Sequence, residues 1–207
     1  LGLRREDYRK IFLWMPTYRR SRDGYIQDTD QLCEEIGSLP LFSGLEDLRR
    51  LNGFLEQHGS YLFLKMHPAQ DLSKLDVGIR SFDRICFLTN EDMRRKKVPL
   101  YSLVREADAL ITDYSSVYFD YLLLDRPIAF VLEDLGSYRG NRGFVVERPL
   151  DYMPGEKIYQ KEELFSFLLQ VEEGEDGYRQ ARAQIRDQVN YYQDGKNCER
   201  LLQLIHL

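Results

Sequence analysis

Residues 109–127 read ALITDYSSVYFDYLLLDRP, and this stretch is the strongest indication of the fold class. The short apolar run Ala109–Thr112 has the length and composition of a buried strand. A helical pattern of apolar residues follows from Val117. Ser115 and Ser116 lie between the two, so the strand leads into a helix start that offers backbone N–H groups and two hydroxyls to an anion. In a parallel α/β sheet this point is the carboxyl edge, where ligands bind. The stretch therefore predicts a phosphate site.

Apolar runs alternate with helical patterns along the chain, which predicts a doubly wound parallel sheet, a Rossmann-like α/β fold. The predicted strands are 11–15, 61–66, 84–88, 109–112 and 127–132. Helices are predicted over 44–58, 100–107, 115–124 and 162–173, with one or two more over 176–206 that break near Asp194 and Gly195. Ser43 and Glu46 predict a capping box for the first helix, and Gly59 its end.

Two connections, 17–43 and 133–161, are long for a minimal strand–helix–strand unit. Both follow predicted strands, so both are expected to overhang the ligand edge. The second contains the segment 137–143, which is interpreted as a flexible cationic loop. Its Arg139 and Arg142 are predicted to close on a diphosphate.

Composition sets outer limits on function. The 207 residues fit one generous domain, and the net charge of −5 argues against a general nucleic-acid partner. Residues 94–97 (Arg94, Arg95, Lys96 and Lys97), here called the basic cluster, are either solvated surface or a contact for an anionic polymer or lipid head group. Three distant cysteines predict reduced thiols in a cytoplasmic protein: Cys33, Cys86 and Cys198. No apolar run is long enough for a membrane span, and the start without Met predicts a fragment of a longer protein.

Lys65-Met66-His67-Pro68 closes the second predicted strand, where alternation puts Lys65 and His67 on the same side. A histidine there can hold a phosphate oxygen as imidazolium or give a proton to a phosphate leaving group. The alternative is a structural histidine that bonds a backbone carbonyl. The nearby Thr-Asp-Tyr-Ser-Ser segment favours the catalytic interpretation of His67. His58 and His206 lie in helical segments and are expected to be structural.

The polar residues near the predicted phosphate also have purely structural interpretations. Asp113, Ser115 and Ser116 can each act as a helix cap. For Asp113 the cap is the favoured interpretation, because a carboxylate beside a diphosphate repels it unless it orients another group. Asp120 lies four residues after Ser116 on the same helix face, where it can accept ribose hydroxyls or stay an exposed carboxylate.

The first predicted strand ends at Met15-Pro16-Thr17-Tyr18-Arg19. Thr17, through its N–H and hydroxyl, and Arg19, through its guanidinium, are expected to face the same edge and bind phosphate. Neither a Walker spacing nor a GxGxxG follows this strand, so P-loop hydrolysis and hydride-transfer cofactors are not supported. No acidic pair has metal-site spacing. Neither a metal nor another cofactor is predicted.

Several segments occur in a familiar order: Pro16-Thr17-Tyr18-Arg19, Lys65-x-His67-Pro68, Thr112-Asp113-Tyr114-Ser115-Ser116, Asp125-Arg126-Pro127, Tyr138-Arg139 and Pro154-Gly155. With them the chain resembles the CDP-glycerol glycerophosphotransferase family, the teichoic acid primases and polymerases of Gram-positive cell walls, over about residues 1–160. The resemblance implies the C-terminal half of a type B glycosyltransferase fold. Residues 1–10 would be an inter-domain linker, and 11–207 a Rossmann-like domain that binds the CDP donor and ends in C-terminal helices.

The resemblance also implies a reaction without a metal. A polyol hydroxyl of a lipid-linked polyol-phosphate acceptor attacks the glycerol-side phosphate of CDP-glycerol or CDP-ribitol, and CMP leaves. His67 would neutralise or protonate the leaving phosphate, and Asp120 would take the ribose. The diphosphate would be cradled by Thr17, Arg19, Ser115 and Ser116. No nucleic acid is expected as a partner.

The family's second important histidine lies in an N-terminal domain that also holds the acceptor, so this chain alone is expected to bind donor weakly rather than turn over. The expected location is cytoplasmic, peripheral on the inner face of the membrane. Two alternatives stay open. One is the C-terminal half of a UDP-sugar glycosyltransferase or sugar epimerase, which CDP against UDP binding would separate. The other is a non-catalytic flavodoxin-like interaction module, which predicts no nucleotide binding.

Overall fold

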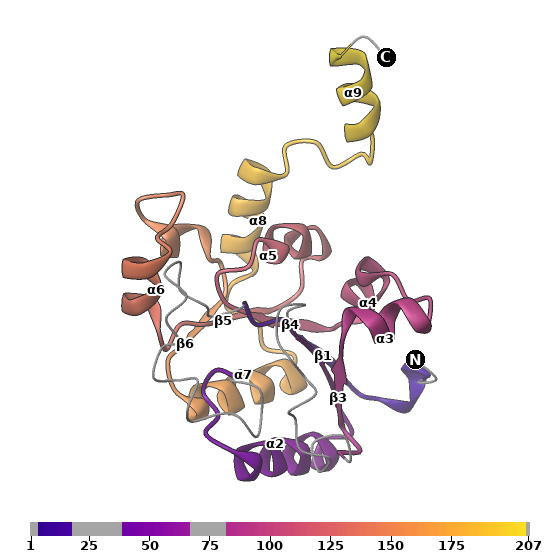
Figure 1. Ribbon diagram of the computed structural model, residues 1–207, viewed down its shortest axis with the longest axis vertical. Helices are drawn as coiled ribbons and strands as arrows, with labels where there is room; N and C mark the ends of the chain where they lie inside the picture. Colours follow the sequence, from indigo (N-terminus) through magenta and orange to yellow (C-terminus); the bar gives the residue numbers. More distant parts are fainter. Residues whose placement is uncertain (1–3, 18–38, 67–81, 206–207) are drawn as a thin grey trace.

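The computed structural model describes residues 4–17, 39–66 and 82–205. Six parallel strands form one sheet in the order β3-β2-β1-β4-β5-β6 (Figure 1). Their bounds are β1 Ile11–Trp14, β2 Tyr61–Lys65, β3 Ile85–Leu88, β4 Ala109–Thr112, β5 Ile128–Val131 and β6 Glu156–Ile158. This is the strand order of dinucleotide-binding folds, in which the direction of winding reverses between β1 and β4. The predicted fold class is confirmed.

The sheet is covered on both faces because its strands are apolar on both sides. On one face α2 (Leu45–Gln57) and α7 (Lys161–Glu173) pack against Phe12 and Trp14 of β1 (Figure 1). On the other face Ile11 and Leu13 pack in a cluster with residues of α3 (Asn90–Arg95), α4 (Leu100–Glu106), α5 (Val117–Tyr121) and α8 (Arg179–Val189). Alternation along β1 therefore divides the core into two layers.

The connection 133–161 differs from its prediction. It contains α6 (Leu135–Asn141), the 3₁₀ helix η5 (Pro149–Tyr152) and the unpredicted edge strand β6. The interpretation of 137–143 as a flexible loop is therefore wrong, because α6 covers most of it. Strand β6 was missed because its three residues Glu156, Lys157 and Ile158 hold one apolar side chain.

The start of α2 corrects another prediction. The expected capping box of Ser43 and Glu46 does not form. The N-cap is Gly44, which has no side chain that could accept a hydrogen bond. Instead the N–H and the hydroxyl of Ser43 both donate to Asp47, at 2.9 and 3.0 Å. Gly59 follows the helix with a φ of +67°, the left-handed conformation expected at its end.

The C-terminal segment forms two helices, as predicted. Helix α8 packs on the body, and α9 (Asn197–Leu204) projects away from it beyond a break that includes Gly195 (Figure 1). Asp125, which follows the 3₁₀ helix η4 (Leu122–Leu124), holds α8 through a 3.2 Å ion pair with the buried Arg182. Among the helices of the described segments, none is long and apolar enough to cross a membrane.

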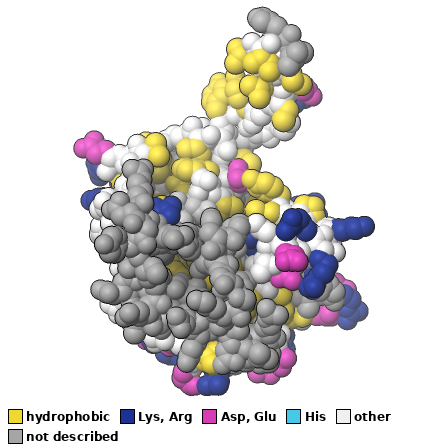
Figure 2. All heavy atoms as spheres, in the orientation of Figure 1, with side chains coloured by type: hydrophobic (Ala, Val, Ile, Leu, Met, Phe, Trp, Pro, Cys, Tyr) yellow, Lys and Arg dark blue, Asp and Glu magenta, His cyan; other side chains and the backbone are white. Residues whose placement is uncertain are grey.

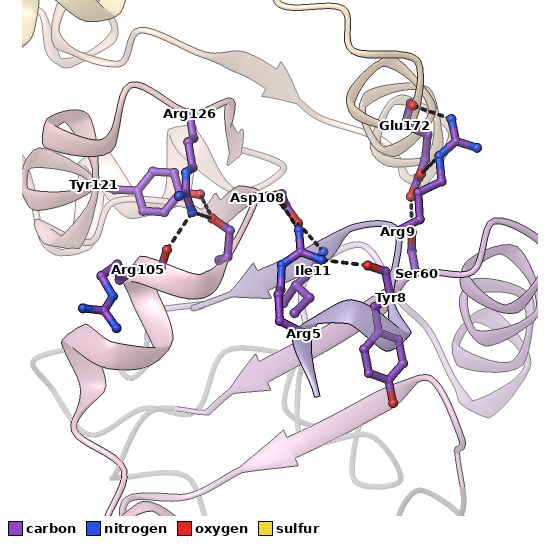
Figure 3. A network of polar contacts seen from close by, with 11 residues as sticks. Arg5, Tyr8, Arg9, Ile11, Ser60, Arg105, Asp108, Tyr121, Arg126 and Glu172 are labelled. Atoms are coloured by element: carbon purple, nitrogen blue, oxygen red, sulfur yellow. Dashed lines mark hydrogen bonds and ion pairs between the residues drawn. The ribbon is translucent and has the colours of Figure 1, made fainter. Parts of the chain in front are cut away.

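Residues 4–10 run along the amino ends of the strands. They contain the 3₁₀ helix η1 (Arg5–Asp7) and contact the body by ion pairs (Figure 3). Arg5 pairs with Asp108 at 2.7 Å, and Arg9 pairs with the buried Glu172 of α7 at 3.4 Å. The segment is therefore fixed to the domain at the edge opposite the predicted ligand site.

Candidate functional site

The site lies where β1 and β4 end side by side. Met15, directly after β1, donates its N–H to the carbonyl of Ile111 at 2.8 Å and accepts the hydroxyl of Thr112 at 3.0 Å. Two residues further, the N–H of Thr17 donates to Oδ2 of Asp113 at 2.8 Å, and the Thr17 hydroxyl donates to Oδ1. The structure thus joins two predicted site residues, Thr17 and Asp113, across the switch point of the sheet.

This contact changes the roles expected for the pair. Asp113 is fully buried, and its carboxylate also accepts the N–H of Tyr114 at 2.6 Å. Asp113 does not cap α5, so the favoured cap interpretation is wrong, and the alternative that it orients another group is the one seen. Both donors of Thr17 point to Asp113, so in this arrangement Thr17 braces the edge instead of giving those donors to a diphosphate.

The segment after β4 offers other donors. Ser116 is the N-cap of α5 and is exposed, yet its side chain makes no capping hydrogen bond. Neither Ser115 nor Ser116 bonds another described residue through its hydroxyl. Helix α5 is shorter than predicted and continues as η4. Its dipole is correspondingly weak, so the two hydroxyls matter more for an anion than the helix does.

Lys65 ends β2, the strand beside β1, and is 6 % exposed. Its Nζ donates to the carbonyl of Met66 at 2.9 Å and has no ion pair with any carboxylate in the described segments. Burial lowers the pKa of this ammonium. A buried cation with one neutral acceptor is costly, and an anion placed beside it would remove that cost.

Asp120 is exposed on α5, one turn after Ser116. The hydroxyl of Tyr101, at the start of α4, donates to Oδ2 of Asp120 at 2.9 Å, and this bond raises the pKa of Tyr101. The bond fixes one carboxylate oxygen. The other accepts no hydrogen bond within the described segments, which leaves an acceptor on the predicted ribose side.

Helix α6 is held against the switch point by aromatic side chains. Tyr114 stacks on Tyr138 at 3.8 Å between ring centroids, and its hydroxyl donates to Asp134 at 2.9 Å. Phe144 packs edge-on against Tyr114 at 5.5 Å. No role was predicted for Tyr114, although its place between Asp113 and Ser115 was a signal. The stack holds α6, which carries the exposed Arg139 and ends at the exposed Arg142, beside the segment that follows β4.

Comparison with known proteins identifies the family. The model of the family CDP-Glycerol:Poly(glycerophosphate) glycerophosphotransferase matches residues 1–207. The chain belongs to this family. The predicted resemblance is confirmed, and family membership favours it over the UDP-sugar and flavodoxin-like alternatives.

Relatives in this family act in teichoic acid synthesis by name. The chain is 34 % identical to the teichoic acid glycerol-phosphate primase of Bacillus subtilis, over 70 % of this chain and 34 % of the primase. It is 29 % identical to the ribitol-phosphate polymerase TarK of Staphylococcus aureus, over 94 % of this chain and 33 % of TarK. It therefore spans about a third of the length of these curated relatives.

Among solved structures the chain matches the wall teichoic acid polymerase TagF with a TM-score of 0.66 and 27 % identity. The match covers 97 % of this chain and 44 % of TagF, which fits one half of a type B glycosyltransferase fold.

The family segment Asp125-Arg126-Pro127 has a structural role. Arg126 donates to the carbonyls of Arg105 and Ala107, both at 2.6 Å, at the amino edge of the sheet.

Some predictions lie beyond what the structure describes. His67 and Arg19 fall outside the described residues, and their roles stay predictions, as do the ligand roles of the other predicted site residues. Cys86 and Cys198 are free thiols, while Cys33 is outside the described part. No three His, Cys, Asp or Glu side chains of the described segments gather as metal ligands do. The absence of a metal or other cofactor stays a prediction.

Proposed function

We propose that this chain is the donor-binding half of a polyol-phosphate transferase of teichoic acid synthesis. Its nucleotide donor would lie across the carboxyl ends of β1 and β4. The observation that carries the proposal is the Thr17–Asp113 contact, which braces the edge at the switch point in a member of this family. The unpaired hydroxyls of Ser115 and Ser116 and the buried Lys65 supply donors for an anion at the same edge.

The donor would use these groups in distinct ways. Thr17 and Asp113 position the edge, and Asp120 accepts the ribose hydroxyls. The diphosphate would be bound by Arg19, Lys65, Ser115 and Ser116, with Arg139 and Arg142 approaching from α6. His67 follows Lys65 by two residues, so it would reach the phosphate that leaves.

The transfer would be a displacement at phosphorus. An acceptor hydroxyl oxygen forms a bond to the polyol-side phosphorus, while the bond from that phosphorus to the bridging oxygen breaks and CMP leaves with the electron pair. A proton from His67 would neutralise the departing phosphate. The proton of the acceptor hydroxyl needs a base. This base and the acceptor site would belong to the part of the full-length relatives that the chain does not span.

The donor class follows from the family description, which names CDP-glycerol, while the likeness to TarK supports CDP-ribitol as the second candidate. The acceptor would be a lipid-linked polyol phosphate. The whole protein would then work as a peripheral enzyme on the inner face of the membrane, where such an acceptor is anchored.

Calorimetry of this chain against CDP-glycerol, CDP-ribitol, CDP and UDP tests the proposal. We expect the three cytidine ligands to bind and UDP to bind less tightly. Binding of UDP without CDP, or of no nucleotide at all, would overturn it. Ser166→Ala on α7 is the matched control for serine variants of the site, because Ser166 lies on another element and bonds only Glu162 of its own helix.

A further inference from the structure

The basic cluster borders an open hollow between α3 and α4. The hollow has a volume of about 660 Å³ and is lined by Asn90, Met93, Arg94, Lys97, Val98, Pro99 and Leu100. Figure 2 shows Lys and Arg side chains gathered at the right of the molecule, over α3 and α4. A concave surface with both cations and apolar side chains suits a flexible anionic chain better than a flat bilayer.

The two cations that line the hollow, Arg94 and Lys97, form no ion pair within the described part of the chain. Of the basic cluster, Arg95 pairs with Asp92 at 2.9 Å, whereas Arg94, Lys96 and Lys97 form no ion pair with a described residue. Asp92 is further engaged as the acceptor of the Thr89 hydroxyl at 2.7 Å. Most other arginines of the described segments pair with a carboxylate or donate to carbonyls. Three cations without an ion pair to a described residue therefore lie within four residues of the chain.

The backbone of the turn presents Lys97 in an unusual way. The N–H of Lys97 donates to Arg94 O at 3.1 Å, and the N–H of Val98 donates to Met93 O at 2.9 Å, the pattern of a Schellman motif. Lys97 has a φ of +53° at the position that normally prefers glycine. Glycine would therefore fit this position without strain, so a Lys97→Gly variant removes the charge and keeps the turn.

The hollow is connected to the proposed donor site. Asn90 directly follows the cap of α3 at the carboxyl end of β3, which is two strands from β1, or about 10 Å along the sheet. At the other end Leu100 adjoins Tyr101, which donates to Asp120 on α5. The Tyr101–Asp120 bond thus joins the end of the hollow at Leu100 to α5.

We propose that the hollow between α3 and α4 holds phosphate groups of a poly(polyol phosphate) chain, a few units from the point of transfer. The proposal rests on the proposed function, because it takes the phosphodiester polymer as the acceptor class. Arg94 and Lys97 would bind successive phosphates, and Met93 and Val98 would contact the carbon backbone between them.

Binding of a short soluble oligo(glycerol phosphate) tests this, with Lys97→Gly as the main variant. Glycine relieves the strain at φ +53°, so this variant should be at least as stable, and lost binding cannot be attributed to unfolding. We expect Lys97→Gly combined with Arg94→Gln to bind the oligomer about tenfold more weakly and with a smaller salt dependence. Arg49→Gln with Arg50→Gln removes the same charge from α2, on the opposite face, and should leave binding unchanged.

Two outcomes overturn the proposal. One is equal oligomer binding by the wild type and the double variant. The other is a double variant that still binds the oligomer but no longer binds phosphatidylglycerol vesicles. That result would assign the cluster to the membrane surface. CDP titration of the same proteins separates the two claims. If the wild type fails to bind CDP, the proposed function fails, and if only the oligomer result fails, the donor site stands.

Discussion

The two edges of the sheet treat charge in opposite ways. At the amino edge charged groups are paired within the domain, as Figure 3 shows. Asp108 accepts both Arg5 at 2.7 Å and the N–H of Ile11 at 2.7 Å. The buried Glu172 accepts the hydroxyl of Ser60 and pairs with Arg9. These contacts hold residues 4–10 and α7 against the strands.

At the carboxyl edge several polar groups lack such partners. Lys65 is buried beside one carbonyl, and the hydroxyls of Ser115 and Ser116 bond no other described residue. Other groups at this edge are paired, among them Thr17 with Asp113 and Tyr114 with Asp134, and the Thr17–Asp113 contact braces the edge. The amino edge thus consists of paired charges, whereas the carboxyl edge also holds groups that a ligand can satisfy.

The largest effect is expected for Arg182→Ala. Arg182 is 1 % exposed and pairs with Asp125 and Asp176, so its loss leaves two carboxylates and a cavity. We expect the free energy of unfolding to fall by about 3 kcal/mol. Urea titration measures it, and Arg179→Ala is the control, since the 78 % exposed Arg179 pairs with the same Asp125. Equal effects of the two variants would refute the importance of burial.

Thr17→Val tests the brace at the carboxyl edge. It keeps the shape of the side chain but removes the hydroxyl that donates to Asp113, so a buried carboxylate loses a donor. We expect a loss of about 2 kcal/mol in stability, together with weaker CDP binding, because the edge is less well held. A variant that binds CDP weakly at unchanged stability would instead make Thr17 a direct ligand.

Ser116→Ala and Asp120→Ala test the unsatisfied groups. Each is exposed, so the urea midpoint should not move. Each should weaken CDP binding by about 1–2 kcal/mol, the value of a hydrogen bond to a charged or buried group. Calorimetry measures this, with Ser166→Ala as control. Titration curves equal to the wild type would contradict the placement of the nucleotide.

Lys65→Met addresses the buried cation at the end of β2. Burial lowers the pKa of Lys65 in the folded state, so the unfolded chain holds this proton more tightly. Stability therefore rises with pH between the lowered pKa and the ordinary value near 10.5. Below that window Lys65 is charged in both the folded and the unfolded state, and burying its charge lowers the free energy of unfolding by the full amount. We expect Lys65→Met to gain about 1 kcal/mol at neutral pH, a gain that shrinks toward pH 10, and to bind CDP more weakly. Urea titrations at several pH values measure the gain, and a loss of stability at neutral pH would count against this account.

The sequence was sufficient for the parts of the fold that depend on apolar runs. Strands such as 109–112 were found because they are buried and short, and α2 and α7 because their apolar residues recur at helical spacing. Helix α3 and strand β6 were missed because both are short and mostly polar. The Thr89–Asp92 capping box that starts α3 was a usable local signal.

For the site, sequence patterns predicted the edge but not the partners. Thr17 and Asp113 were both placed at the carboxyl ends of strands, and parallel pairing of β1 and β4 brings those ends together. That they bond each other depends on strand order, which local patterns do not contain. The stack of Tyr114 on Tyr138 joins β4 to a helix that the sequence left as a loop, so it was equally out of reach.

Strand β1 is tied at both ends. Its first residue, Ile11, bonds Asp108, which also holds Arg5, and the chain beyond its last residue bonds Asp113 through Thr17. All four residues of the strand, Ile11–Trp14, are buried in the sheet. The segment around Arg5 and the ligand edge are therefore connected through a single buried strand at the centre of the domain.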